Sequence, residues 1–196
     1  IDGAIVYGAC SSKMDPASTY VNIENYDSIT VIKGSQSVLY GAGGPGGVVR
    51  YERITEPLAH SQPSKGDSAQ AKAYKFKIGQ TFDSNAEAKT TIGDFTLGLG
   101  QAYFRINGSY SEAGNYETGT GLKPLTEYET SNYAAIIGKR LDDGSKLEFT
   151  YTNNSQENIG FAGLPMDIVY SYTDIYNLKY HRVTQFGPFS SMKVEL

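Results

Sequence analysis

Hydrophobic and polar residues alternate with a period of two along most of the chain after residue 72. Residues 101–110 show this well, because Phe104 and Ile106 lie on either side of Arg105. A period of two places alternate side chains on opposite faces of a β-strand. The same pattern recurs at 74–79, 147–152, 176–181 and 192–196. We therefore expect about seven amphipathic antiparallel strands of about ten residues each.

The first part of the chain has a different texture. Residues 26–33 (YDSITVIK) predict a strand that ends at Gly34, after which Ser35 can cap one or two helical turns. The glycine-rich run 41–47 ends that helix, and residues 46–53 predict a second strand. The pattern thus predicts three parts: a mixed α/β unit at 1–57, a polar linker at 58–72 and the strands of 73–196.

The predicted turns differ in length. A tight turn, Asp142–Gly144, contrasts with long polar loops expected at 114–129 and 153–172. Short turns on one side, long loops on the other and aromatic residues near strand ends are typical of a transmembrane β-barrel. A soluble antiparallel sandwich also alternates, and stays open as a second interpretation.

Composition agrees with a β-rich chain and excludes several classes of function. The 196 residues include 22 Gly, 16 Tyr and 8 Phe, and a net charge of −4 argues against a nucleic-acid binder. The apolar runs are far shorter than the ~20 residues of a membrane-spanning helix. The single cysteine excludes an internal disulfide, and no set of catalytic residue types indicates an enzyme.

Residues 26–53 (YDSITVIKGSQSVLYGAGGPGGVVRYER) resemble the end of the plug domain of TonB-dependent outer-membrane receptors. In that family a Tyr-Asp strand ends in Lys-Gly, a Gln-Ser helical turn ends in Tyr-Gly, and glycines precede a Gly-Val-Val strand. Ser35 stands where the family usually has proline. The segments 105–115, 141–146 and 163–167 resemble early barrel hairpins of these receptors.

The resemblance implies a mainly β fold, with a partial α/β plug followed by antiparallel strands of an incomplete transmembrane β-barrel. It implies a place in the outer membrane of a Gram-negative bacterium, with membrane lipid and the TonB protein as partners. The chain begins with Ile1 and has no TonB box, so we expect a fragment: the end of the plug and the first strands of the barrel.

Cys10 and Met14 are the candidate metal ligands. Thiolate and thioether are soft donors that suit Cu(I), and a spacing of four brings both to one side of a helical turn. The segment Cys-x-x-x-Met-Asp-Pro resembles the TonB-dependent copper receptors, whose plug Cys and Met bind copper with a His-x-Met pair from the barrel. The resemblance implies import of copper ions, driven by TonB, with no organic cofactor. The chain itself contains no His-x-Met pair.

Two alternatives stay open at this point. The first is a ferric-siderophore receptor in which Cys10 and Met14 only pack, and the second is a soluble all-β binding module. Met166 is a weaker candidate for a transient contact with copper, and His181 for a position that lines the lumen. The glycines of 41–47 lack the Gly-Lys-Ser/Thr ending of a phosphate-binding loop, so we expect a conformational role for them.

Overall fold

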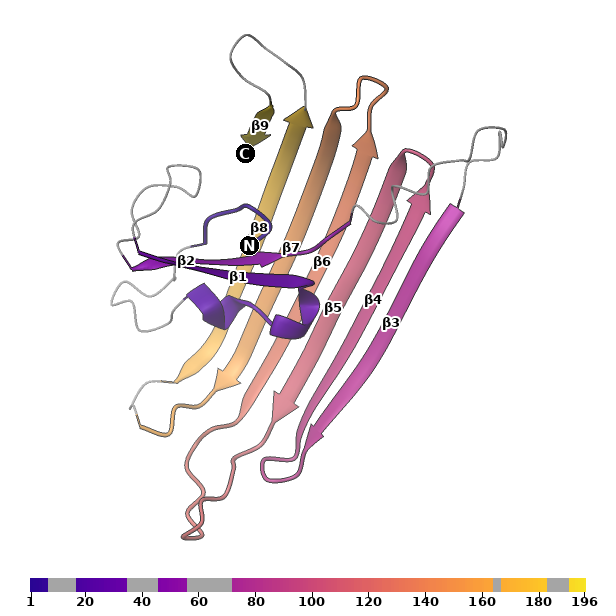
Figure 1. The fold of residues 1–196 in the computed structure, drawn as a ribbon. Helices are drawn as coiled ribbons and strands as arrows, with labels where there is room; N and C mark the ends of the chain where they lie inside the picture. Colours follow the sequence, from indigo (N-terminus) through magenta and orange to yellow (C-terminus); the bar gives the residue numbers. More distant parts are fainter. Residues whose placement is uncertain (7–16, 35–45, 56–71, 164–166, 183–190) are drawn as a thin grey trace.

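The protein has two layers, a small N-terminal layer and a large antiparallel sheet behind it (Figure 1). The computed structural model describes residues 1–6, 17–34, 46–55, 72–163, 167–182 and 191–196. Within these ranges the chain forms 3₁₀ helices and β-strands and no α-helix, which confirms the mainly β prediction.

The N-terminal layer comprises residues 1–6, 17–34 and 46–55 as described. Its elements are the 3₁₀ helices η1 (Ala17–Tyr20) and η2 (Ile23–Asn25) and the strands β1 (Ser28–Lys33) and β2 (Gly47–Glu52). The two strands form an antiparallel hairpin in which Val31 lies opposite Val49. Both predicted strands are thus present, whereas the helical turn expected after Ser35 lies outside the described residues.

The large sheet confirms the prediction of about seven antiparallel strands. Its order follows the chain, and every neighbouring pair is antiparallel. The strands are β3 (Lys72–Asp83), β4 (Ala88–Leu99), β5 (Ala102–Ala113), β6 (Tyr128–Arg140), β7 (Lys146–Ile159), β8 (Ile168–Arg182) and β9 (Met192–Glu195). Strands β3 to β8 have 12 to 15 residues, which is longer than the expected ten.

The connections between strands lie at the two ends of the strands (Figure 1). Residues 100–101 and 141–145 form short turns at one end. The short connection 84–87 and the longer segment 114–127 lie at the other end, with the described residues that follow β7 and precede β8. The loop expected at 153–172 is wrong in its extent, because β7 runs to Ile159 and β8 begins at Ile168. The sequence pattern indicates a loop here because polar residues occupy both faces of the strand.

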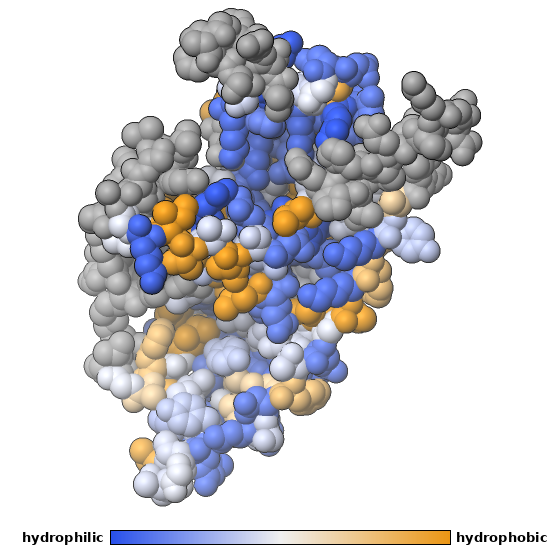
Figure 2. All heavy atoms as spheres, in the orientation of Figure 1, coloured by the Kyte–Doolittle hydropathy of each residue, from blue (hydrophilic) through white to orange (hydrophobic). Residues whose placement is uncertain are grey.

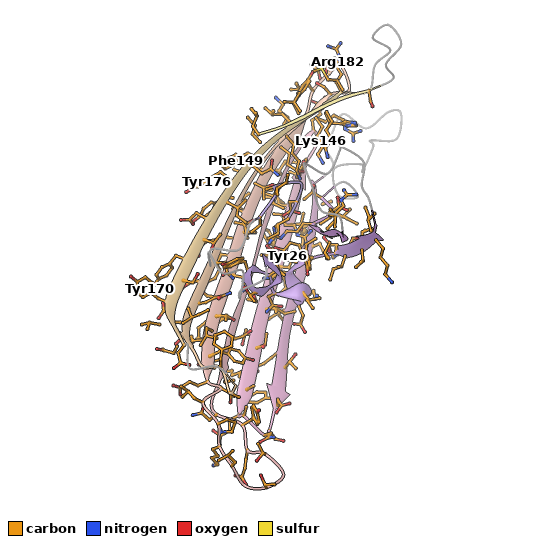
Figure 3. All side chains as sticks on the ribbon, turned by 90° about the vertical axis from the view of Figure 1, so that its left-hand side faces the viewer. Tyr26, Lys146, Phe149, Tyr170, Tyr176 and Arg182 are labelled. Carbon is orange, nitrogen blue, oxygen red and sulfur yellow. The ribbon has the colours of Figure 1, made fainter. Side chains whose placement is uncertain are left out.

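The sheet has an inner face toward the N-terminal layer and an outer face on the opposite side. In β5 the inner side chains of Tyr103, Arg105 and Asn107 are buried, whereas the outer Ile106 is 47% exposed. Figure 3 shows Tyr170 and Tyr176 on the outer side, with Tyr26 in the layer across the sheet. The sheet is therefore polar where it is covered and apolar where it is exposed.

The hydrophobic core between the layers is small. Tyr20 of η1 and Ile136 of β6 are each 2% exposed, and few other large apolar side chains in the described ranges are buried. Figure 2, viewed from the N-terminal side, shows hydrophobic side chains gathered over the β1–β2 hairpin and hydrophilic ones over the sheet above it. Because so few apolar side chains are buried between the layers, polar contacts join them.

In the described part of the chain, no helix has the length and apolar character to cross a membrane.

Candidate functional site: the interface between the N-terminal layer and the sheet

The predicted copper ligands, Cys10 and Met14, lie in residues 7–16, outside the described residues, and remain a prediction. The same is true of Met166. His181 is described, and lies in β8 opposite Lys146 of β7 and Lys193 of β9. Within the described ranges, no group of three or more His, Cys, Asp or Glu side chains is placed to hold a metal ion.

The inner face of the sheet carries a dense set of buried polar side chains. They come from β4 to β8, the strands that face the N-terminal layer. Their members are Thr96, Arg105, Asn107, Ser109, Ser111, Asn132, Glu148, Thr150, Thr152, Asn154, Gln156 and Asn177. Buried polar groups need hydrogen-bond partners, and many of these side chains find them in the N-terminal layer.

Helix η2 is fixed to β5 through Asn25. The Nδ2 group of Asn107 donates to the Asn25 carbonyl oxygen at 2.7 Å, and Asn25 Nδ2 donates to Ser109 Oγ at 2.9 Å. Amide side chains of β7 and β8 bind the backbone of the same layer. Gln156 Nε2 donates to the Thr19 carbonyl oxygen, and Asn177 Nδ2 donates to that of Asp2 at 2.7 Å. Neutral hydrogen bonds from three strands, β5, β7 and β8, therefore hold the N-terminal layer.

Arg53 follows β2 and organises the interior of the N-terminal layer. Its backbone N–H donates to Asp2 Oδ1 at 2.8 Å, and its guanidinium forms an ion pair with the same carboxylate. The guanidinium also lies 4.3 Å from the centroid of the Tyr26 ring and donates to Thr152 Oγ1 at 3.3 Å. Burial raises the pKa of Tyr26 to about 12, which keeps its hydroxyl neutral.

Arg105 of β5 joins the two layers. Its Nε atom lies 3.2 Å from both carboxylate oxygens of Asp94 on β4, and its Nη1 atom binds Asp27 and the carbonyl oxygen of Ile54. Burial tends to raise the pKa of Asp27, but the hydrogen bonds from Arg105 and from the Ile54 N–H outweigh it and lower that pKa. Asp27 is therefore a carboxylate at neutral pH.

Glu148 of β7 is the centre of a third buried cluster. Its carboxylate accepts hydrogen bonds from Tyr103 Oη at 2.5 Å and from Thr55 Oγ1 at 3.0 Å. The ammonium groups of Lys146 and Lys179 lie 3.1 and 3.2 Å from it. The ring of Tyr103 reaches this position across Gly138, where an added Cβ atom would lie 2.0 Å from the ring. The absence of a side chain at Gly138 thus permits the cluster.

The sequence interpretation did not include Arg53, Arg105 or Glu148. A usable signal was present for the last two, because both are charged residues at polar positions of a clearly alternating strand. Arg53 follows the second predicted strand, and nothing in its local pattern points to Asp2, which is distant in sequence. The three clusters fix the N-terminal layer against the sheet, and none of them pairs a nucleophile with a base.

Comparison with known proteins identifies this layer. Residues 1–48 match the family model described as the TonB-dependent receptor plug domain. Residues 1–48, about a quarter of the chain, are therefore similar to a TonB-dependent receptor plug domain. From here on we call the N-terminal layer the plug, after this similarity, and the sheet of β3 to β9 the wall. The polar interface described above joins the plug to the wall. No curated protein matches the chain in sequence.

The two layers together resemble a solved structure described as copper transporter OprC. The TM-score is 0.84 at 23% sequence identity, and the match covers 99% of this chain and 28% of that chain. The match shows that the two proteins share this fold. Both matches are to receptor or transporter proteins and neither is to an enzyme. The chain spans less than a third of the length of that transporter.

Proposed function

We propose that the chain forms the plug and part of the barrel wall of an outer-membrane transporter of a Gram-negative bacterium. The observation that carries this proposal is the contrast between the two faces of the sheet. Phe76, Ile78 and Tyr176 are more than 60% exposed on the outer face, whereas the inner face is polar and covered by the plug. An exposed apolar face suits lipid, and a polar inner face suits a lumen that the plug fills.

We also propose that the cargo is a copper ion, bound as Cu(I) by Cys10 and Met14 of the plug. Two observations support this cargo. The sulfur ligands suit Cu(I), and the chain shares its fold with a protein described as a copper transporter. Ferric siderophore is the competing cargo, but no described contact favours it. TonB, pulling on the plug from the periplasm, would supply the work that moves the plug and releases the ion.

The interface suits a plug that stays in place at rest and can be moved. Neutral hydrogen bonds from Asn107, Gln156 and Asn177 hold the plug backbone, and each contributes only modestly because water can replace the protein partner. When the plug leaves, the inner face exposes amide, hydroxyl and charged groups that water solvates well. The energetic cost of opening is thereby limited.

Copper binding by the full receptor tests the cargo. Cu(I) retention would be measured by competition with a Cu(I) chelator for wild type, Cys10→Ser and Met14→Leu. We expect each variant to weaken retention at least about tenfold, as loss of a metal-site residue generally does. Met192→Leu is the matched control, because Met192 lies in β9 and is 51% exposed. It should retain Cu(I) like wild type.

Unchanged Cu(I) retention in Cys10→Ser and Met14→Leu would contradict the copper site. Growth on a ferric chelate that requires the receptor, with copper uptake unaffected by its deletion, would assign siderophore as the cargo. Neither result would disturb the plug–wall architecture, which rests on the fold and the family match.

A further inference from the structure

The buried charges at the plug–wall interface are mostly neutralised within their own layer. Arg53 pairs with Asp2, and both belong to the plug. Glu148 pairs with Lys146 and Lys179, and all three belong to the wall. Among the described residues, the hydrogen bonds of these two clusters across the interface have at most one charged partner each. Arg53 donates to Thr152, Thr55 donates to Glu148, and Asn177 donates to the Asp2 carbonyl oxygen.

Arg105 differs from these clusters because it has carboxylate partners in both layers. Its Nε and Nη2 atoms bind Asp94 of the wall, whereas its Nη1 atom binds Asp27 of the plug. Of the ion pairs that join two described residues, Arg105–Asp27 is the one that crosses between the layers. Asp27 has a partner in its own layer as well, the Ile54 N–H at 2.8 Å.

This distribution of partners governs the free energy of moving the plug. Separating a buried ion pair is costly when it leaves an uncompensated charge in a poorly solvated place. Here the wall retains Arg105–Asp94, and the plug retains Arg53–Asp2 and the capped Asp27 carboxylate. The other described hydrogen bonds that break have at most one charged partner, so each is weaker than a hydrogen-bonded pair of opposite charges. Among the described residues, Arg105–Asp27 is therefore the strongest single interaction that separation of the two layers breaks.

We propose that Arg105 and Asp27 form a latch that sets the force needed to displace the plug, and that Asp94 holds Arg105 after the plug leaves. Asp27 and Arg105 hold the closed state, and Asp94 stabilises the open state by keeping the arginine compensated. The inference rests on the proposed movement of the plug but not on the identity of the cargo.

Force spectroscopy on the full receptor in a lipid bilayer tests the latch. The plug is pulled from its N-terminal side, and the rate of its release from the wall is recorded at a fixed load without copper. Asp27→Asn removes the charge and keeps an oxygen that can accept the Ile54 N–H. We expect it to speed release by about tenfold or more, the effect of losing one charge-assisted hydrogen bond.

Asp94→Asn is the decisive comparison, because it removes a carboxylate from the same arginine. Release would leave Arg105 without a carboxylate, so we expect this variant to release the plug more slowly than wild type. A purely structural role for the cluster predicts faster release in both variants. Opposite signs for Asp27→Asn and Asp94→Asn therefore support the latch, and faster release in both contradicts it.

Ser109→Ala provides a scale for a neutral contact, because it removes one uncharged hydrogen bond between the wall and Asn25. The latch predicts a much smaller change in release rate for Ser109→Ala than for Asp27→Asn. Equal effects would overturn the proposal, whether or not Asp94→Asn reaches the membrane. Since copper takes no part in the measurement, a failed copper assignment leaves this result intact.

Discussion

The two faces of one sheet meet their surroundings in opposite ways. On β5, Arg105 and Asn107 point inward and bind the plug, while Ile106 between them points outward and is 47% exposed. The inner face satisfies its polar groups through specific partners, so each contact depends on geometry. If the outer face meets lipid, as proposed, it needs only apolar character, because lipid chains have no geometry to match.

This contrast indicates where substitutions should be tolerated. On the inner side, the removal of one member of a buried charge cluster leaves its partner uncompensated. On the outer side, the proposed contact with lipid makes the penalty depend on polarity and on depth in the membrane, not on the identity of the apolar residue. Four experiments with effects of decreasing size test this difference.

Arg53→Met should have the largest effect. The substitution leaves the Asp2 carboxylate, which is 5% exposed, without its ionic partner, and should lower the free energy of unfolding by about 3–5 kcal/mol. Arg50→Met is the matched control, because Arg50 lies three residues earlier, in β2. The Arg50–Glu52 pair is about one-third exposed, so the control should cost about 0–1 kcal/mol. Urea unfolding of the full receptor in lipid vesicles measures both. Similar losses in the two variants would show that the plug interior does not depend on Arg53.

Ile106→Lys tests the outer face. Ile106 lies in the middle of β5, so a charge there should destabilise the membrane-embedded protein by about 2–4 kcal/mol. Gln80→Lys on β3 is the control, because it lies on the same face close to the strand end and should cost about 0–1 kcal/mol. Unfolding from lipid vesicles gives both values. Equal and small effects would be expected of a water-exposed face and would contradict the membrane assignment.

Gly138→Ala tests the close packing that supports the Glu148 cluster. The added methyl group would collide with the Tyr103 ring and move its hydroxyl from Glu148, so we expect a loss of about 1–3 kcal/mol. Gly93→Ala is the control, since an added Cβ atom there meets no atom within 4 Å. Thermal unfolding should show a lower midpoint for Gly138→Ala alone. An unchanged midpoint would mean that Tyr103 adapts without cost.

The pH dependence of plug attachment should be the smallest effect. The pKa of Asp27 is lowered below its ordinary value of 3.8 in the folded protein. Its contribution is therefore fully present above that value and is lost as the pH falls through the folded-state pKa. The stability difference between wild type and Asp27→Asn should stay constant from pH 7 to about 5, and shrink below about 4. A difference that changes near neutral pH would point to another group.

Strand periodicity made the wall predictable where the two faces differ clearly. Residues 102–110 alternate because Phe104 and Ile106 lie on the outer face while Arg105 and Asn107 meet the plug. The alternation is weak in β6, where Ala134, Ala135, Ile136 and Ile137 are consecutive and apolar on both faces. It is also lost at 153–157, where polar residues line both faces, so the sequence pattern there is typical of a loop.

The interface could be predicted only in character, not in its pairs. Charged residues inside alternating strands indicate a polar lumen, but Arg105 and Asp27 are 78 positions apart and meet only after the plug docks. Arg53 and Thr152, 99 positions apart, are a similar case. The candidate ligands Cys10 and Met14 followed from donor chemistry and a family resemblance, and stay a prediction.

The central claim is that the outer face meets lipid while the inner face meets the plug. Spin labels placed singly along residues 147–156 of the full receptor, with Cys10 replaced by serine, test it most directly. We predict that oxygen dissolved in the bilayer reaches labels at Leu147, Phe149 and Tyr151, and that labels at Glu148, Thr150 and Thr152 are shielded from it. If a water-soluble nickel reagent reaches the labels at Leu147, Phe149 and Tyr151 instead, the outer face meets water, which would contradict its contact with lipid.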